Sequence, residues 1–395
     1  MGKLFAYTFE HLHALNRYSR TSLGGVTHKI KCIRHRCFMV PRESIPTILI
    51  ELPGKIHERT AKVLEWRQWA RDQAKIAVEN RTKHIDDPSL ENLLVEIDWL
   101  VQDNISKPDG VTQRFLKYVS MTASIPETWE NSCLRLSLDE LSLLWTRRLL
   151  NRVPLQYLTN MAYWRDLTLV VTPAVLIPRP ETEMVIDFAL EARHKYHSSC
   201  VVNAQSALEL QRGAWLDLGT GSGAIAIALA HSFITDHAAS VPPIYAVDVS
   251  PEACSIAEHN VKRYRLQQSI HIVQGSWFRA LDGEKNKNIK FAGIVSNPPY
   301  IPKEDLDFLQ PEVQHEPALA LDGGCGNGLD SLHEICMDSK NHLMNGGILI
   351  LETHGDEQVT IIEKVLRDSG LFTQIEVRHD CVGVKRFVIS QRRFD

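Results

Sequence analysis

The sequence predicts a doubly wound α/β sheet that follows a small helical domain and a β-hairpin linker. Two observations lead to this prediction. From Trp215 onward, short apolar runs alternate with stretches that have the spacing of one helix face, which is typical of a mostly parallel sheet covered by helices. Before residue 152 the apolar positions have helical spacing alone. A sheet of this kind binds its ligand at the carboxyl ends of its strands.

The composition is that of a globular protein. The chain of 395 residues is 44% apolar and long enough for about two domains. No run approaches the roughly 18 consecutive apolar residues of a membrane-spanning helix, so no membrane partner is expected. The eight cysteines are scattered without the spacing of zinc ligands, so neither a disulfide framework nor a metal site is expected.

Residues 1–42 differ in composition from the rest of the chain. They hold eight Lys and Arg but a single acidic residue, Glu10, and they lack a long apolar stretch. This pattern is typical of an organelle transit peptide, and the alternative is a basic tail without a targeting role. Without this segment the net charge is −11, which disfavours general affinity for phosphates, so no direct nucleic-acid partner is expected.

Residues 44–151 are expected to form a helical domain that serves substrate recognition or packing. A helix is predicted over Leu64–Ala74, and the next begins after Ser89, where leucines recur at the spacing of one helix face. Another begins at Ser137, because Ser137 and Glu140 form the signature of a capping box.

Residues 152–180 are expected to form the hairpin linker. A strand is predicted over Tyr163–Val171, a turn over Thr172–Ala174 and a second strand over Val175–Ile177. The α/β catalytic domain is then expected over residues 181–395. Its strands are predicted at Trp215–Gly219, Ile244–Val249, Ile270–Gln274, Phe291–Ser296 and Ile348–Glu352, with a closing pair around Ile375 and Phe387. Its helices are predicted through Ile225–Ala230, Ile256, Ser331–Met344 and Val365.

A glycine-rich loop follows the first strand of this domain and opens a helix. Glycines in this position let the backbone approach a ligand, and the helix N–H groups face it. Through Ala224 the pattern also matches the dinucleotide fingerprint, so a nicotinamide or flavin site competes, and a tight turn without ligand is the structural alternative. The expected cofactor-binding residues here are Asp217, Gly219, Thr220, Gly221, Ser222 and Gly223.

Asp248 ends the next strand, where a carboxylate can accept hydrogen bonds from both ribose hydroxyls of an adenosine. It follows Gly219 by 29 residues, where about 20 is usual, and a surface insertion over His231–Pro243 explains the excess. Considered alone, Asp248 could also be a strand-end cap.

Asn297, Pro298, Pro299 and Tyr300 directly follow the apolar strand Phe291–Val295. An amide nitrogen is a poor nucleophile because its lone pair is delocalised. The side-chain oxygen of Asn297 can accept one amide hydrogen and the carbonyl of Pro298 the other. The two prolines fix the loop in advance, and Tyr300 offers an aromatic wall. The loop therefore indicates methyl transfer from a sulfonium to a planar nitrogen, without a metal.

The residues leave other functions open. A nucleic-acid amino-methyltransferase would act on adenine N6 or cytosine N4, which are also conjugated planar nitrogens, and would flip its base out of a duplex. A nicotinamide-dependent oxidoreductase would use the glycine loop but give Asn297–Tyr300 no role. A binding module that has lost activity is the third alternative, and a rigid Pro-Pro turn with an Asn cap is the structural one.

The sequence resembles the HemK-like (PrmC-type) release factor glutamine methyltransferases from about Leu136 to the C-terminus. The motifs that carry the resemblance are Val175–Glu183, Asp217–Gly223 and Asn297–Tyr300, supported by Arg152–Tyr157, Glu316–Gly324 and Gly346–Glu352. The resemblance implies a class I S-adenosylmethionine-dependent methyltransferase fold. It also implies N5-methylation of the glutamine in the Gly-Gly-Gln motif of class I peptide chain release factors, with a helical domain that helps bind this substrate.

Individual roles follow from the resemblance. It implies that Gly219–Gly223 and Asp248 hold S-adenosylmethionine and that Trp277 packs near its adenine. It implies that Asn297–Tyr300 hold the glutamine, with Asn297 also touching the cofactor. The expected catalytic residues are Asn297, Pro298 and Tyr300.

Two positions depart from the family pattern. Asn160 stands where the family usually has glycine, and asparagine tolerates the left-handed conformation. Ser276 replaces an acidic residue, which puts a hydrogen bond to the adenine amine in doubt, and Trp277 beside it could equally be core packing. The charged residues of Arg179–Glu183 either line the cleft or are structural.

The residues of several motifs, among them Trp164-Arg165, are most similar to those of cyanobacterial members of the family. Together with the basic leader this predicts a chloroplast enzyme that acts on an organellar release factor. A mitochondrial location is the alternative, because both compartments use bacterial-type release factors.

Overall fold

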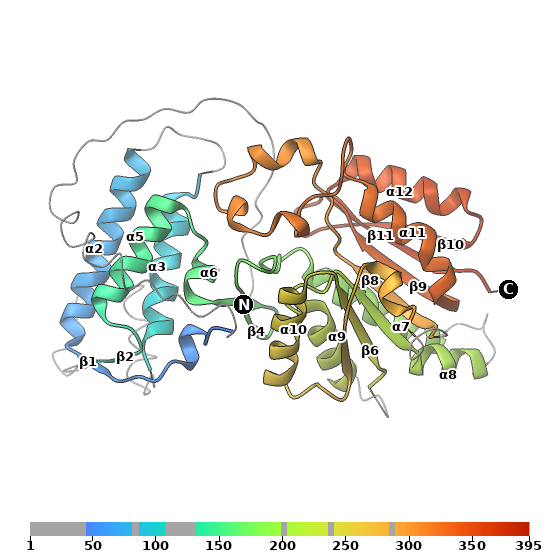
Figure 1. The fold of residues 1–395 in the computed structure, drawn as a ribbon, viewed down its shortest axis with the longest axis horizontal. Helices are drawn as coiled ribbons and strands as arrows, with labels where there is room; N and C mark the ends of the chain where they lie inside the picture. The colour runs from blue at the N-terminus through green and yellow to red at the C-terminus, as the bar shows by residue number, and fades with distance from the viewer. Residues whose placement is uncertain are drawn as a thin grey trace.

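The computed structural model describes residues 45–80, 87–106, 132–198, 204–235, 241–283 and 289–394. The predicted transit peptide lies outside the described residues. A helical domain and an α/β domain lie side by side (Figure 1), joined by a short helix and a hairpin and by a segment that returns from the α/β domain. Among the described helices, none combines the length and apolar character that a membrane crossing requires.

In the described part of the helical domain there are three long helices, which are α2 (Thr60–Glu79), α3 (Leu90–Asn104) and α5 (Leu138–Asn151). Ser89 caps α3 by accepting a hydrogen bond from the backbone N–H of Asn92, and both bonds of the predicted capping box are present at Ser137. The fully buried indole of Trp145 lies in the core and donates to the carbonyl of Ala70. The helix starts predicted at Ser89 and Ser137 are therefore confirmed, whereas α2 extends beyond the predicted Leu64–Ala74 at both ends.

A small antiparallel pair, β1 (Ile56–Glu58) with β2 (Ser132–Leu134), was not expected from the helical pattern. It joins segments that lie far apart in the chain, and strands of three residues are too short to show a period. A 3-10 turn, η1 (Leu49–Glu51), precedes it.

The hairpin linker is shifted from its predicted position. After α6 (Leu155–Thr159), strand β3 (Met161–Trp164) pairs with β4 (Leu167–Val170). A turn is present at Thr172–Ala174 as predicted, where the N–H of Val175 donates to the carbonyl of Thr172 at 3.0 Å, but it lies after the hairpin and does not connect its strands. The hairpin turn lies at Arg165, which adopts the left-handed conformation with φ 49°. Val175 and Ile177 form no strand there, because they are buried against α10 instead.

The α/β domain contains a seven-stranded sheet with the order β10-β11-β9-β8-β5-β6-β7. Strands β5 to β9 run parallel, and β11 is antiparallel to both β9 and β10. The predicted doubly wound sheet is therefore confirmed. The strands are β5 (Ala214–Leu218), β6 (Ile244–Asp248), β7 (Ile270–Gln274), β8 (Phe291–Ser296), β9 (Leu343–Glu352), β10 (Phe372–His379) and β11 (Lys385–Arg392).

Helices cover both faces of this sheet. One face packs against α7 (Glu183–Ser198), α8 (Ala204–Arg212) and α9 (Ala224–Thr235), and the other packs against α11 (Asp330–His342), α12 (Asp356–Asp368) and the 3-10 turn η2 (Trp277–Leu281). The strands alternate accordingly, since Trp215 of β5 faces the first group whereas Leu216 and Leu218 face the second. Helix α10 (Pro251–Arg263) packs against β6, β7 and the hairpin.

Two helices end at other residues than predicted. Helix α11 ends at His342 and not at Met344, because β9 begins at Leu343. Helix α9 continues to Thr235, into the segment expected as a surface insertion, of which residues 236–240 lie outside the described ones. Helices α7 and α8 were not predicted.

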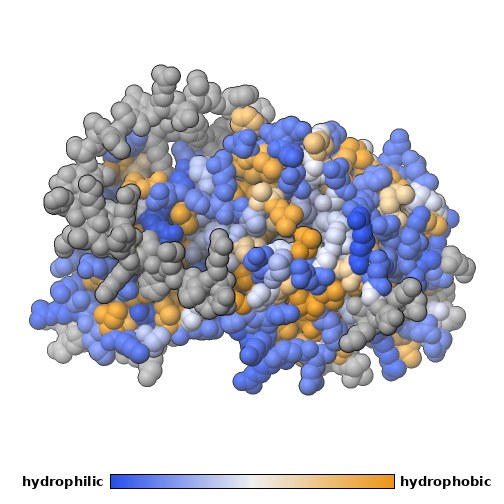
Figure 2. Space-filling view, in the orientation of Figure 1, coloured by the Kyte–Doolittle hydropathy of each residue, from blue (hydrophilic) through white to orange (hydrophobic). Residues whose placement is uncertain are grey.

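The segment between β8 and β9 returns toward the helical domain. It contains three 3-10 turns, η3 (Lys303–Phe308), η4 (Val313–His315) and η5 (Ala318–Ala320), drawn in orange near the top centre of Figure 1. Figure 2 shows apolar side chains gathered over the middle of this face of the molecule. Phe308 and Leu319 of this segment are 56% and 58% exposed.

Candidate active site

The predicted site residues lie at or just after the carboxyl ends of four adjacent parallel strands, β5, β6, β7 and β8. Because the strands are parallel, these ends lie at one edge of the sheet, where open α/β sheets bind ligands. The fold thus brings together residues that are up to 83 positions apart, from Asp217 to Tyr300.

The glycine loop adopts a backbone that favours glycine at three positions. Gly219, Gly221 and Gly223 have φ angles of 75°, 54° and 83°. A Cβ atom on Gly221 would meet no other atom within 4 Å, so this position is open, and only its backbone conformation requires glycine. The loop leads directly into α9. It therefore exposes backbone at a helix N-terminus, where an anion or a polar ligand group finds donors.

Asp248 faces the glycine loop from the end of β6. Its Oδ2 accepts a hydrogen bond from the N–H of Gly221 at 2.8 Å, and its Oδ1 accepts one from the N–H of Ser250 at 2.9 Å. Burial raises the pKa of Asp248 above its usual value, although these backbone bonds act in the opposite direction. The carboxyl group lies where the loop backbone and a ligand would meet.

Asp217 supports the loop from beneath. It is fully buried, and its Oδ2 accepts a hydrogen bond of 2.7 Å from the hydroxyl of Thr220. Burial raises the pKa of Asp217 to about 7. On the other side of the loop, the amide of Asn260 donates to the carbonyl of Ser222 at 2.9 Å. Two buried side chains therefore fix the backbone of the loop.

Trp277 completes the wall beside the glycine loop. It begins η2 with a φ of 43°, an uncommon conformation for a bulky residue, and its side chain is half-buried. A Cβ atom on Gly219 would lie 3.6 Å from the ring of Trp277 and 3.9 Å from the carbonyl oxygen of Asn297. The glycine loop, the indole and the Asn297 loop therefore converge. Ser276 next to it is half-buried.

Asn297 is oriented by a neighbouring hydroxyl. Its Nδ2 donates to Oγ1 of Thr182 at 3.0 Å, and within the described residues no group donates to its Oδ1. The preceding Ser296 is buried and donates to the carbonyl of Leu218 at 2.7 Å, which ties the end of β8 to the start of the glycine loop. The free acceptor of Asn297 therefore has a defined position relative to that loop.

The rest of the loop is held through its backbone. Pro298 is buried, and the carbonyl of Tyr300 accepts a hydrogen bond of 2.8 Å from Gln358. Gly323 approaches so closely that a Cβ atom there would lie 2.7 Å from the backbone of Tyr300, which explains a glycine at that position. The Tyr300 ring lies 5.9 Å from that of His354, and burial raises the pKa of Tyr300.

The charged residues before α7 make structural contacts. Arg179 pairs with the buried Glu316 at 2.6 Å, and Glu316 also accepts from the N–H of Ile177. Glu183 accepts a hydrogen bond from the backbone N–H of Arg165 in the hairpin turn. These bonds fix the loop that presents Thr182 to Asn297. Thr182, Asn260, Gln358 and Glu316 were missed as site-shaping residues in the sequence interpretation. Only Asn260 gives a signal, because it is a polar residue on the buried face of α10.

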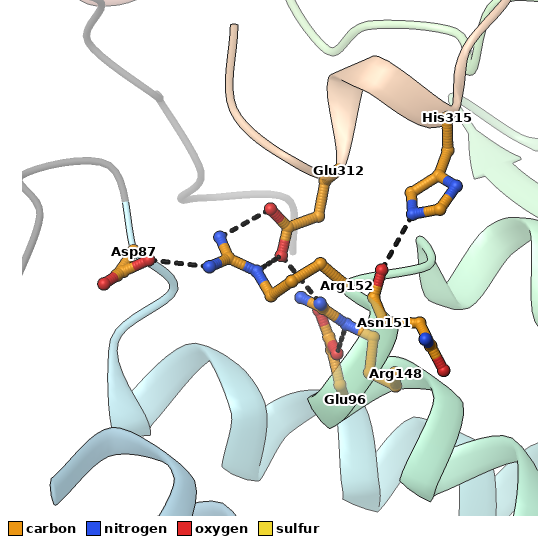
Figure 3. Close-up of polar contacts among 7 residues, drawn as sticks. All are labelled: Asp87, Glu96, Arg148, Asn151, Arg152, Glu312 and His315. Atoms are coloured by element: carbon orange, nitrogen blue, oxygen red, sulfur yellow. Dashed lines mark hydrogen bonds and ion pairs between the residues drawn. The ribbon is translucent and has the colours of Figure 1, made fainter. Parts of the chain in front are cut away.

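An ion-pair cluster joins the helical domain to η4 (Figure 3). The buried Arg148 of α5 contacts Glu96 at 2.6 Å and Glu312 at 2.7 Å. Arg152 binds Glu312 through two nitrogens at 2.6 Å each and Asp87 through a third. Although burial alone would raise the pKa of Glu312, the two arginines bring it below its usual value.

The second tie between the domains is a hydrogen bond to the end of α5. A ring nitrogen of His315 lies 2.8 Å from the carbonyl oxygen of Asn151 (Figure 3). Since the carbonyl only accepts, this nitrogen carries the proton. The segment that follows the Asn297 loop is thus anchored to the helical domain, and the two domains together frame the candidate site.

The residues present fit an adenosine-containing cofactor. Three glycines open the backbone beside a carboxylate at a strand end, and an indole flanks them. Next to this cradle, Asn297 offers an acceptor that suits an N–H₂ group. The arrangement can hold a nucleoside and a planar amide side by side.

A family model described as RNA cap guanine-N2 methyltransferase matches residues 212–314. This range contains the glycine loop, Asp248, Trp277 and the Asn297 loop.

Proteins named release factor glutamine methyltransferase are similar over a longer stretch. The one from Gloeobacter violaceus is 40% identical over 253 residues, which is 64% of this chain and 79% of its own length. The one from Synechocystis is 36% identical over 297 residues, 75% of this chain and 89% of its own length. The one from Thermosynechococcus vestitus is 41% identical over 259 residues, covering 65% and 81% of the two chains.

Proposed function

The chain belongs to the release factor glutamine methyltransferase family, and from this premise we propose its substrate and the role of each site residue. It transfers a methyl group from S-adenosylmethionine to N5 of the glutamine in the Gly-Gly-Gln motif of a class I peptide chain release factor. The observation that carries this proposal is the side chain of Asn297, whose Nδ2 is bound to Thr182 so that Oδ1 faces away as an acceptor beside the glycine loop.

The cofactor is held by the residues at the ends of β5, β6 and β7. Gly219–Gly223 let it approach the backbone, Asp248 accepts from its ribose hydroxyls, and Trp277 packs against its adenine. Asp217 and Thr220 act from beneath by fixing the loop. When bound, S-adenosylmethionine supplies a methyl group on a positively charged sulfur.

The Asn297 loop holds the glutamine. Oδ1 of Asn297 and the carbonyl of Pro298 accept the two amide hydrogens, which places the nitrogen and draws electron density toward it. Pro298 and Pro299 fix the loop before substrate arrives, so little ordering is needed at binding. Tyr300 forms the wall against the planar amide. Positioning and polarisation, without a strong base, then account for the reaction.

The protein substrate is recognised across both domains. The segment with η3 and η5, which follows the Asn297 loop in the chain, exposes Phe308 and Leu319, and the ion-pair cluster fixes this segment to the helical domain. Exposed apolar side chains that gather at one place are typical of a surface that binds a protein. This supports a folded release factor, in preference to free glutamine, as the substrate.

The enzyme acts in the chloroplast on the release factor of that organelle. The composition of residues 1–42 and the similarity to the cyanobacterial relatives support this location, and mitochondria are the alternative. Residues 1–42 fused to a fluorescent protein are expected to direct it into chloroplasts. Fluorescence in mitochondria, or in the cytosol, would contradict the proposed location.

Transfer of a labelled methyl group tests the proposed activity. The full chain is incubated with labelled S-adenosylmethionine and, in parallel, an organellar release factor, duplex DNA or RNA. Label is expected in the release factor alone. Label in nucleic acid but not in the factor would support transfer to an exocyclic base amine, the alternative that the matching RNA cap guanine-N2 methyltransferase model also suggests.

Asn297→Ala tests the assigned role of the loop. Removal of the acceptor is expected to lower the transfer rate by at least about 100-fold, because a misplaced reacting group costs about that much. Cofactor affinity, measured by calorimetry, is expected to change little. Loss of cofactor affinity together with the rate would show that Asn297 acts on the cofactor and not on the glutamine.

A further inference from the structure

We propose that Gln358 is a positioning residue for methyl transfer, because its side chain holds the backbone that places the ring of Tyr300. The inference rests on the proposed function, in which this ring forms the wall against the amide of the substrate. Gln358 does not touch the substrate in this account. It acts through Tyr300.

Gln358 lies in the first turn of α12, and its side chain joins three segments of the site edge. It is 5% exposed. Its Nε2 donates to the carbonyl of Tyr300 at 2.8 Å and to that of Asn327 at 2.7 Å, and its Oε1 accepts from the N–H of His354 at 2.9 Å. Since a carbonyl only accepts and a backbone N–H only donates, a single orientation of the amide satisfies all three bonds.

The type of residue distinguishes a role in the loop from a role in the helix. A side chain in the first turn that accepts from the backbone just before the helix, as Gln358 does from His354, is an ordinary contact at a helix start. A glutamate would make it equally well, and its negative charge would suit the helix N-terminus. Only the amide also donates to the two carbonyls. The helix start therefore needs the oxygen of Gln358, and the loop needs its N–H₂ group.

The carbonyl of Tyr300 depends on this donor. The next residue, Ile301, is paired with another segment, because its N–H donates to Leu321 at 2.9 Å and its carbonyl accepts from the N–H of Gly323 at 2.8 Å. The carbonyl of Tyr300 takes no part in this pairing. Among the residues that the structure describes, Gln358 is the one group that donates to it. Loss of the amide would leave this end of the Asn297 loop with one attachment fewer.

The same amide also places the neighbour of the Tyr300 ring. The ring of His354 lies 5.9 Å from that of Tyr300, at an angle of 56°. Gln358 binds the backbone of both residues, so one side chain sets the positions of both rings. A misplacement of about 1 Å in a reacting arrangement costs about 100-fold in rate. Gln358 therefore influences the rate through the placement of the wall.

Gln358→Glu provides the first test, because it retains the length of the side chain and the contact with His354. The ionised carboxylate donates to neither carbonyl, and the protonated form has one proton for two carbonyls. We expect kcat to fall on the order of 10- to 100-fold, because the wall is displaced. Cofactor affinity and the KM for the release factor are expected to stay within about 2-fold, as for an interaction that acts at the chemical step. A kcat equal to that of the wild type would overturn the proposal.

A second pair of variants separates placement of the loop from stability of the helix. Gln358→Met removes all three hydrogen bonds at similar size, and Leu366→Ala leaves a cavity under the same helix, where Leu366 is 1% exposed. Both variants are expected to be less stable than the wild type. At a temperature where both are folded, kcat is expected to fall on the order of 10- to 100-fold in Gln358→Met alone. An equal fall in Leu366→Ala would show a general effect of α12 and would contradict the specific role.

The ring signals of Tyr300 in an NMR spectrum test the proposal without any substrate. The chain has nine tyrosines, so these signals can be assigned in full-length protein with ¹³C-labelled tyrosine by their loss in Tyr300→Phe. Gln358→Glu and Gln358→Met are expected to shift them, whereas Leu366→Ala leaves them in place. Unchanged signals in both Gln358 variants would contradict the proposal. A wild-type protein that methylates no release factor, but whose signals shift as expected, would refute the proposed function alone.

Discussion

At the scale of single residues, the site is built around carboxyl groups that are buried at strand ends. Asp217 is fully buried beneath the glycine loop, and its Oδ2 accepts from Thr220. Burial raises its pKa to about 7, so the folded protein binds this proton more tightly than the unfolded chain does. The loop is therefore held by a residue whose ionised form opposes folding.

Asp217→Asn tests this residue through the pH dependence of stability. Because the folded-state pKa is raised, the wild type loses stability as the pH rises toward and through about 7. Asparagine can still accept from Thr220 but does not ionise. The loss in unfolding free energy between pH 6 and pH 8.5 is expected to shrink by about 1–2 kcal/mol in the variant. Urea unfolding at both pH values measures it, and identical losses in the two proteins would contradict the assignment.

The sequence indicates which residues bind the cofactor and the glutamine, but not which side chains fix their positions. The glycine pattern, Asp248 and Asn297 can be recognised because each stands next to a predicted strand. Thr182 lies 115 positions before Asn297 and becomes its partner only when the fold brings the loop before α7 to the end of β8. The left-handed conformation of Asn160 could be predicted, because asparagine stands there where the family usually has glycine. Its φ of 56° at the end of α6 confirms this prediction.

At the scale of elements, one side chain of α10 connects the hairpin to the glycine loop through hydrogen bonds. Asn260 is fully buried and accepts from the N–H of Val170 at 2.9 Å. Its amide donates to the carbonyls of Val170 and Ser222. The hairpin therefore supports the cofactor loop as well as linking the domains.

Asn260→Ala is expected to loosen both elements. It leaves three buried backbone groups without partners, which should lower the unfolding free energy by about 2–4 kcal/mol. The affinity for S-adenosylmethionine, measured by calorimetry at a temperature where the variant is folded, is expected to fall as well, because the loop is less well ordered. A destabilised variant with unchanged affinity would restrict the role of Asn260 to the hairpin.

The position of the hairpin turn could not be predicted from the sequence, and the reason is physical. Thr172–Ala174 contains proline and forms a turn, but one that follows the hairpin, whereas the hairpin turn at Arg165 has no glycine or proline. That turn is stabilised from outside, since Arg165 bonds to Glu183 through its backbone and to Asp187 through its side chain. Such tertiary contacts override local turn preference.

At the scale of the whole molecule, the two domains are joined by buried charge. Arg148 is 3% exposed, and it shares Glu312 with Arg152. The partners lie at least 160 positions apart in the sequence. No local pattern could predict this contact, although the helical domain and the sheet were each predictable from their own periodicity.

Glu312→Gln tests the joint. The substitution leaves Glu96 as the remaining acidic partner of the buried Arg148. The unfolding free energy should fall by about 3–5 kcal/mol, as it typically does when a buried ion pair loses one partner. Because the pKa of Glu312 is lowered, its contribution is present above the usual pKa and is lost as the pH falls through the lowered value. The KM for the whole release factor is expected to rise more than that for a short Gly-Gly-Gln peptide. Glu363→Gln, at an exposed pair with Arg367 on α12, is the control and should change neither quantity measurably.

The central claim is that the acceptor is the amide nitrogen of one glutamine in a release factor. Mass spectrometry of an organellar release factor, digested after incubation with the full-length protein and S-adenosylmethionine, tests it most directly. The account predicts one added methyl group, located by fragmentation on the side chain of the Gly-Gly-Gln glutamine. An unmodified glutamine in the presence of active enzyme, or a methyl group on another residue, would contradict it.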